Sequence, residues 1–192
     1  MLCLGAVIVL IKSYDMPTRA MEPTLHQGDH IEALPIFGRS LYRGMIVVFH
    51  PPTDPLITLF GRVLALPGDR VRVISGKIEV NGKQVYEPYL KLGVEGAGID
   101  FPTVPDKYDD NQDVLRLQTE FYADSVKDGV LSLPAGHYFI MGDNRGASVD
   151  SRRYGPIPLS SIVAQPILVY GTKAAGRSSL RRIPGEPLVL SR

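Results

Sequence analysis

The sequence has one cysteine, little net charge and almost no helical periodicity. With Cys3 as its only cysteine, the chain cannot form an internal disulfide. Its formal net charge of +1 provides no electrostatic attraction for the phosphates of a nucleic acid. Almost no segment repeats apolar residues at the 3.6-residue period of an amphipathic helix. The sequence therefore argues against nucleic-acid binding and against a helical fold.

The apolar run at the N-terminus is too short to span a bilayer. Met1 to Ile11 contains no charged residue, and Lys12 follows it. A membrane-spanning helix needs about twenty apolar residues, and this run covers roughly half of that length. A cleaved secretory signal fits the length, but no basic residue precedes the run and no small-residue cleavage site follows it cleanly. A trimmed transmembrane anchor, an interfacial anchor and a buried first strand all remain open on the pattern alone.

Glycine and proline are abundant, and they separate short apolar runs. Nineteen glycines and sixteen prolines in 192 residues favour strands and turns over long helices. Residues 46–49 form a continuous apolar run, which predicts a strand buried on both faces. Asn81-Gly82 is a strong signal for a hairpin turn. Strands are expected at 31–36, 45–50, 62–66, 70–74, 78–80, 137–141 and 162–170. The predicted fold class is mainly β.

Two stretches differ from this pattern. Residues 88–130 are polar, contain scattered prolines and show no periodicity, so they read as an excursion from the main sheet. An acidic cluster lies within it, formed by Asp106, Asp109, Asp110 and Asp113. The segment 172–192 is rich in Arg, Gly and Ser, and a loose tail is expected there. A chain of this length fits one domain that carries a smaller insertion.

Four sequence blocks occur in a fixed order. They are MPTRAMEPTL at 16–25 followed by Gly28-Asp29, RGMIVVF at 43–49, GRV at 61–63 with PGDRV at 67–71, and GDNRGASVDSRRYG at 142–155. Together they resemble the type I signal peptidases, membrane-anchored serine proteases that remove signal peptides from exported proteins. Met45 stands where the family has aspartate. The last block is long and specific, and the resemblance covers about residues 7 to 170.

The resemblance implies a fold, a location and partners. It implies a mainly β catalytic core at 13–74 and 136–171, an inserted cap domain at 75–135 and an N-terminal anchor remnant at 1–12. It places the main domain on the extracytoplasmic side of the cytoplasmic membrane. It implies signal peptides or preproteins, the cytoplasmic membrane and an active signal peptidase as candidate partners. No cofactor is predicted.

Both catalytic residues of the family are absent here. The family cleaves with a serine activated by a lysine whose pKa is lowered by burial. The nucleophile position, directly before Met-x-Pro-Thr-Leu, is Ala20, and the lysine position, directly before Arg-Val, is Gly61. A methyl group cannot attack a carbonyl, and glycine has no side chain to act as a base. No lysine occurs between Lys12 and Lys77, so a small alignment shift cannot restore one.

The residues around the two positions are retained. By resemblance, Thr18 helps to build the oxyanion hole, and Ser148 orients the lysine. Asp150 and Arg152 brace the loop, together with Asp143 and Asn144 of the same motif. Met21 and Pro23 belong to the substrate groove. The alternative for Ser148, Asp150 and Arg152 is a polar network that stabilises a turn, and the loss of the dyad favours it.

Other residues are poor substitutes for the dyad. Arg62 stays protonated at any usable pH and, on strand geometry, faces away from position 61. His50 ends a strand and is interpreted as a surface histidine. Thr18 and Ser148 are weak candidates as rescue nucleophiles. The remaining histidines, His26, His30 and His137, show no metal-ligand spacing, so no metal is predicted.

Three functional hypotheses remain. The first is a non-cleaving family member that binds extended Ala-x-Ala peptides by strand addition, and that assists an active signal peptidase, guards a substrate or regulates export. The second is an active signal peptidase that uses other groups. The third is a β-domain that serves only as a structural partner of the export machinery.

Overall fold

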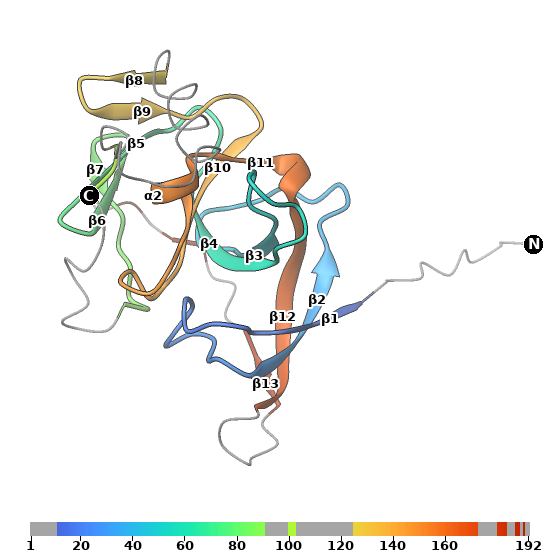
Figure 1. Cartoon of the computed structure of the whole chain (residues 1–192). Coiled ribbons are helices and arrows are strands. Elements are labelled where there is room, and N and C mark those ends of the chain that lie inside the picture. The colour runs from blue at the N-terminus through green and yellow to red at the C-terminus, as the bar shows by residue number, and fades with distance from the viewer. Residues whose placement is uncertain are drawn as a thin grey trace, which may run out of the picture.

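The computed structural model describes residues 11–90, 100–102, 125–172, 180–183, 187–188 and 190. Its strands form two antiparallel sheets (Figure 1). The larger sheet has the order β1-β2-β12-β3-β4-β10-β11, and β13 pairs with β12. Its strands are β1 (Lys12–Asp15), β2 (Asp29–Pro35), β3 (Ile46–Phe49), β4 (Leu59–Ala65), β10 (His137–Met141), β11 (Ile157–Pro158), β12 (Ile162–Thr172) and β13 (Arg181–Arg182).

The smaller sheet has the order β7-β6-β5-β9-β8. Its strands are β5 (Arg70–Ile74), β6 (Lys77–Val80), β7 (Lys83–Gln84), β8 (Val126–Lys127) and β9 (Val130–Ser132). Asn81 and Gly82 join β6 to β7 with positive φ angles of 55° and 76°, as a two-residue hairpin turn requires, which confirms the predicted turn. β5 pairs with β6 and with β9, so the smaller sheet includes residues before 75. Residue 75 is the predicted start of the inserted cap domain. The division into domains stays a prediction.

The mainly β fold class is confirmed, and the strands follow the predicted runs closely. β3 is buried at all four positions, as its continuous apolar run predicts. Two short helical turns, α2 (Ser151–Tyr154) and η1 (Leu159–Ser161), lie between strands of the larger sheet.

Side chains of the larger sheet alternate between two buried clusters. The front cluster consists of Met16, Met21, Leu25, Ile31, Ala33, Ile46, Val48, Phe60, Ala164, Val169 and Ile183. The back cluster consists of Ile36, Leu41, Met45, Val47, Phe49, Val63, Ile140, Ile157 and Ile162. Successive residues of a strand point to opposite faces, so Ile46 and Val48 of β3 join the front cluster, and Val47 and Phe49 join the back cluster.

The tail differs from its expectation where the structure describes it. β13 pairs with β12 through Val169↔Arg181 and Leu168↔Arg182, and Ile183 joins the front cluster. The prediction of a loose tail is therefore wrong for residues 181–183. The physical reason is that Ile183 is apolar and covers core side chains, while β12 offers a free stretch of backbone beyond β3.

Two further expectations fall outside the described residues. The apolar run at 1–10 and the acidic cluster at 106–113 are both undescribed, although β1 begins directly after the run, at Lys12. Among the residues that the structure describes, no helix has the length and apolar character to cross a membrane.

Candidate active site

The loop that carries the nucleophile position is held against the loop of the 142–155 motif. The backbone N–H of Asn144 donates to the carbonyl oxygen of Ala20 at 2.9 Å. The side-chain amide of Asn144 donates to the carbonyl oxygen of Arg19 at 3.1 Å. Two blocks that lie more than a hundred residues apart in the sequence are therefore joined at the position expected for the nucleophile.

Gly142 allows these loops to approach closely. A Cβ atom on Gly142 would lie 2.4 Å from Cβ of Ser148 and 2.6 Å from the carbonyl oxygen of Ala20. Both distances are far below an ordinary van der Waals contact, so only glycine fits here. Gly142 therefore lies directly between the backbone of Ala20 and the side chain of Ser148.

The space next to Gly61 is occupied. A Cβ atom on Gly61 would lie 2.4 Å from Cγ2 of Ile140 and 3.3 Å from Cε1 of Phe49. Both neighbours belong to the back cluster and are fully buried. The apolar core therefore packs directly against the backbone of Gly61, the position that the family resemblance assigns to the lysine.

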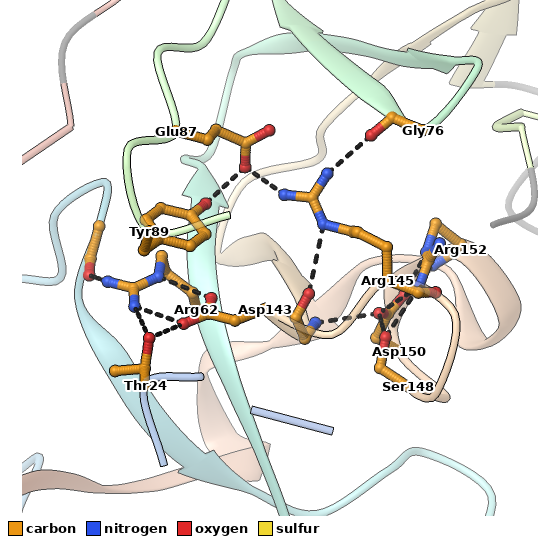
Figure 2. Close-up of polar contacts among 12 residues, drawn as sticks. Thr24, Arg62, Gly76, Glu87, Tyr89, Asp143, Arg145, Ser148, Asp150 and Arg152 are labelled. Carbon is orange, nitrogen blue, oxygen red and sulfur yellow. Dashed lines mark hydrogen bonds and ion pairs between the residues drawn. The ribbon is translucent and has the colours of Figure 1, made fainter. Parts of the chain in front are cut away.

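Ser148 is engaged in a hydrogen-bond network with Asp150 and Arg152 (Figure 2). Its hydroxyl donates to Oδ2 of Asp150 at 2.6 Å and accepts from Nη2 of Arg152 at 2.8 Å. Asp150 also accepts from the backbone N–H of Gly142 at 3.0 Å and from Nε of Arg152 at 2.9 Å. As the N-cap of α2 it accepts from the backbone N–H of Arg152 as well. The carboxylate is saturated with donors, so the arrangement is that of a loop-stabilising network.

A second buried network surrounds Arg62, which is 5% exposed. Arg62 forms a bidentate ion pair with Asp143: Nε donates to Oδ1 at 2.9 Å, and Nη2 donates to Oδ2 at 2.6 Å. The hydroxyl of Thr24 donates to the same carboxylate at 2.5 Å, and Nη1 of Arg62 donates to the carbonyl oxygen of Gly44 at 2.8 Å. These contacts confirm that Arg62 faces away from the space beside Gly61.

This network continues to the smaller sheet through residues that sequence reasoning missed. The guanidinium of Arg62 lies 3.9 Å from the ring centroid of Tyr89, and the hydroxyl of Tyr89 hydrogen-bonds to Glu87. Arg145 pairs with the same Glu87 carboxylate and donates to the carbonyl oxygen of Gly76 at 2.7 Å (Figure 2). Arg145 lies inside the 142–155 motif and was available to sequence reasoning. Glu87 and Tyr89 lie in or beside a stretch without periodicity, so no local signal pointed to them.

Burial alters the ionisation of this network. Desolvation of Tyr89, followed by the negative charges of Glu87 and Asp143, raises the pKa of its phenol well above 10.0. The pKa of Arg62 is raised as well: burial opposes its charge, but the hydrogen bond and the charge of Asp143 outweigh that opposition. Both groups keep their protons at any physiological pH, which makes them structural and not proton-transfer groups.

The other predicted site residues have separate positions. The hydroxyl of Thr18 accepts a hydrogen bond from the backbone N–H of Ala20 at 3.3 Å. Met21 is fully buried in the front cluster, and Pro23 is half-buried. Tyr14 on β1 contacts Phe60 on β4 edge-to-face, with ring centroids 6.1 Å apart, so these two strands face each other across the front cluster.

The histidines make local contacts. His50 contacts the carbonyl oxygen of Ile57 through Nδ1 at 2.8 Å, which ties down the β3–β4 loop. His30 pairs with Asp15 and stacks on Tyr170. His137 lies 3.0 Å from the carbonyl oxygen of Ala135. These contacts fit structural roles.

The comparisons with known proteins agree with the arrangement of the four blocks. The family model described as signal peptidase, peptidase S26, matches residues 1–171. The chain belongs to this family. Signal peptidase I V of Bacillus subtilis is 34% identical over 155 residues, which cover 78% of this chain and 80% of that protein. Signal peptidase I of Pseudomonas fluorescens is 32% identical over 186 residues.

The lengths of the matched segments differ among relatives. The chain is matched over 84% of its length by the Pseudomonas fluorescens protein but spans only 65% of that protein. A crystal structure of a signal peptidase I from Enterococcus faecalis aligns with a TM-score of 0.44 at 24% identity, covering 65% of this chain and 94% of that chain.

The two positions that the family resemblance assigns to the catalytic pair carry neither a hydroxyl nor an amine. Ala20 provides no nucleophile and Gly61 no base. The hydroxyl of Ser148 is engaged by a carboxylate and a guanidinium, and that of Thr18 accepts from its own loop. These contacts hold the backbone and side chains of the two loops in place.

Proposed function

We propose that this chain is a signal peptidase homologue that binds signal peptides without cleaving them. The observation that carries the proposal is the closed space beside Gly61, where a methyl group of Ile140 lies 2.4 Å from the position of any Cβ atom. A site that had merely lost a lysine would keep a cavity. Here a buried side chain takes that volume, so a single substitution back to lysine meets the core.

The retained frame supports a binding role. Asn144 still fixes the loop of Ala20, and Asp150 still organises the loop of Ser148. These contacts fix the two loops beside which a peptide would lie. They also stabilise the fold, so their presence alone does not separate binding from a purely structural role.

The proposed peptide site lies between β1 and β4. β1 is the first strand in the order of the larger sheet, and an extended peptide can add to such an edge through backbone hydrogen bonds. Tyr14 and Phe60 contact each other edge-to-face over this site, so an entering peptide must separate the two rings. Beneath them Met21 and Leu25 are fully buried in a filled cluster, so side chains that point inward must be small, as in an Ala-x-Ala sequence.

The proposed location is the extracytoplasmic face of the cytoplasmic membrane, where signal peptides emerge. A protein that binds without cleaving would assist an active signal peptidase or protect its substrate. The apolar run at 1–11 and the family's membrane association motivate this location.

The test compares cleavage and binding by three proteins: the natural chain, the double variant Ala20→Ser/Gly61→Lys, and a triple variant that adds Ile140→Met. Methionine is unbranched at Cβ, so it keeps apolar volume while removing the methyl that blocks position 61. With a fluorogenic Ala-x-Ala peptide, we expect no cleavage by the natural chain or the double variant, and measurable cleavage by the triple variant. Cleavage by the natural chain that Thr18→Ala or Ser148→Ala abolishes would support the active-enzyme hypothesis instead.

Binding is measured by fluorescence anisotropy of the labelled peptide with the natural chain. A peptide with leucine at the −1 and −3 positions is the matched ligand control. Tyr14→Ala should weaken binding about tenfold or more, because it removes an aromatic wall of the site. Tyr86→Ala, which changes an exposed tyrosine after β7 in the smaller sheet, should not. No detectable binding of either peptide would leave the structural-partner hypothesis.

A further inference from the structure

We infer that the edge of β12 beyond β3 is a strand-binding site filled by the chain's own C-terminal segment, and that this segment restricts peptide binding at the β1–β4 site. The segment, here called the strap, comprises residues 181–183, Leu188 and Leu190 of the described tail. The family match ends at residue 171, so the strap lies outside the matched residues. The inference rests on the proposed function and concerns the regulation of the same site.

The strap is bound to the larger sheet by backbone and side-chain contacts. β13 pairs with β12 (Figure 1), and the backbone N–H of Ile183 donates to the carbonyl oxygen of Ile167 at 3.1 Å. Nη2 of Arg181 donates to Oδ2 of Asp29 at 2.8 Å. The side chain of Asp29 is only 3% exposed, so release of the strap takes a cation away from a buried carboxylate. These contacts favour the docked strap.

The strap also reaches the smaller sheet. The backbone N–H of Leu188 donates to the carbonyl oxygen of Arg43 at 2.9 Å. Leu190 forms an antiparallel bridge with Val85, directly after β7. The side chains of Leu188 and Leu190 pack against the buried cluster that includes Val85. The strap therefore contacts both sheets.

Ile183 connects the strap to the proposed peptide site. It is 8% exposed and belongs to the front cluster, which also contains Met21 and Leu25 beneath that site. A buried apolar cluster has little free volume, so the inward-pointing side chains of a bound peptide require a shift of its members. Ile183 directly follows a strand of two residues, whereas Ile31 and Val169 lie within strands of seven and eleven residues. Ile183 is therefore held less firmly than these strand residues.

An apolar pocket beside Ile183 leaves room for this shift. It has a volume of about 320 Å³, and its lining includes Ile183, Leu34, Ile46 and Pro166. A side chain next to unfilled space makes fewer dispersion contacts, so its displacement is less costly than that of a side chain enclosed on all sides. The docked strap and a bound peptide therefore compete through the front cluster, and the peptide binds best when the strap is released.

A disulfide that locks the strap tests this inference in the full chain. Leu168 and Arg182 stand opposite each other in the register, and the hydrogen bond from Ile183 to Ile167 makes theirs a non-hydrogen-bonded pair. The Cα atoms of such a pair lie about 4.5 Å apart, within the range that a disulfide spans. The variant is Leu168→Cys/Arg182→Cys with Cys3→Ser, so that no third thiol competes. Neither member of the new pair belongs to the front cluster.

Binding of the labelled Ala-x-Ala peptide is measured with the oxidised and the reduced forms of this variant. We expect the oxidised form to bind about fivefold or more weakly than the reduced form, because apparent affinity falls with the population of the competent state. Ile183→Ser, which weakens docking of the strap, should bind more tightly than the natural chain. Leu180→Ser, at a residue that directly precedes the strap and is 75% exposed, is the matched control and should change nothing.

Trypsin provides an independent measure of the strap. Residues paired in a sheet resist proteolysis until they separate, so saturating peptide should accelerate cleavage after Arg182 several-fold. An unchanged rate with bound peptide would show that peptide and strap bind together, and would overturn the competition.

Equal binding by the oxidised and reduced forms would overturn the inferred regulation and leave the proposed function intact. Tighter binding by the oxidised form would overturn it as well, because the strap would then help to build the site. Absence of binding by both forms and by Ile183→Ser would reject the proposed peptide binding and the regulation together. The comparison of the two forms alters no residue of the front cluster, so it decides the matter even if Ile183→Ser does not fold.

Discussion

The packing beside Gly61 predicts whether the substitution Gly61→Ala stabilises or destabilises the protein. In a strand interior, glycine is less favourable than alanine by about 0.5–1 kcal/mol, because it loses more backbone entropy on folding. Without a steric obstacle, Gly61→Ala would therefore stabilise the protein. The φ angle of Gly61 is not in the left-handed region, so no backbone strain opposes the change.

The obstacle is Cγ2 of Ile140. It lies 2.4 Å from the new Cβ, whereas apolar carbon atoms normally approach to about 3.5–4.0 Å. Ile140 cannot move easily, since its backbone N–H donates to the buried hydroxyl of Ser151 at 2.9 Å and its strand pairs with β4. Overpacking of this kind costs about 1–3 kcal/mol. We therefore expect Gly61→Ala to destabilise the chain, by about 1–2 kcal/mol net after the entropy gain.

Urea unfolding of a double-mutant cycle tests this expectation. Ile140→Ala alone should cost about 2–5 kcal/mol, because the side chain is fully buried. In that background Gly61→Ala should become neutral or stabilising, giving a coupling energy of about 1–3 kcal/mol. Ile140→Val is the matched control, since valine keeps the Cγ2 methyl and should relieve nothing. If Gly61→Ala stabilises the natural chain, the inference that Ile140 fills the space beside position 61 is wrong.

Three further predictions concern the buried networks. Arg62→Leu leaves the carboxylate of Asp143 buried without its charge partner, and should cost about 3–5 kcal/mol in urea unfolding. For Tyr89 the folded-state pKa is raised above 10.0, so its phenol ionises at lower pH in the unfolded chain than in the folded chain. The free energy of unfolding should therefore fall as the pH rises above 10.0. Tyr89→Phe should remove the part of this fall that is due to Tyr89. Gly142→Ala would place Cβ 2.6 Å from a backbone oxygen that cannot rotate away, and should lower the thermal midpoint far more than Gly171→Ala, whose nearest contact is 3.4 Å.

Matched changes separate these effects from general damage. Arg72→Leu removes a partner of Glu79 in an ion pair whose side chains are 42% and 27% exposed, and should cost only about 0–1 kcal/mol. Equal losses from Arg72→Leu and Arg62→Leu would contradict the buried-pair argument. For Tyr89, absorbance of tyrosinate should show one phenol that ionises only when the protein unfolds, and a phenol that titrates normally would contradict the burial.

Much of the fold could be predicted because its signals are local. The apolar run of β3 and the Asn81-Gly82 turn depend on neighbouring residues alone, and both agree with the structure. The 142–155 motif was assigned to the site through the family resemblance, and its contact with Ala20 comes from the structure.

The remaining features depend on contacts distant in sequence. No pattern around Ile140 shows that its methyl group fills the space beside Gly61. Tyr89 lies under the guanidinium of Arg62, and its own neighbours give no hint of that contact. Ile183 looked like part of a polar tail because its burial depends on β12 and the front cluster, which local composition does not reveal.

The position of β12 has a consequence for how the chain acquires its structure. This strand comes late in the sequence, yet it lies between β2 and β3, which precede it by more than a hundred residues. During synthesis, β2 and β3 lack their common partner strand until β12 has been made, and their unpaired edges can pair with the wrong strands. Pairing strands that are distant in the sequence is slow, so the pairing of β12 with β2 and β3 should limit the folding rate. A nascent chain halted before residue 162 would be the species most in need of a chaperone.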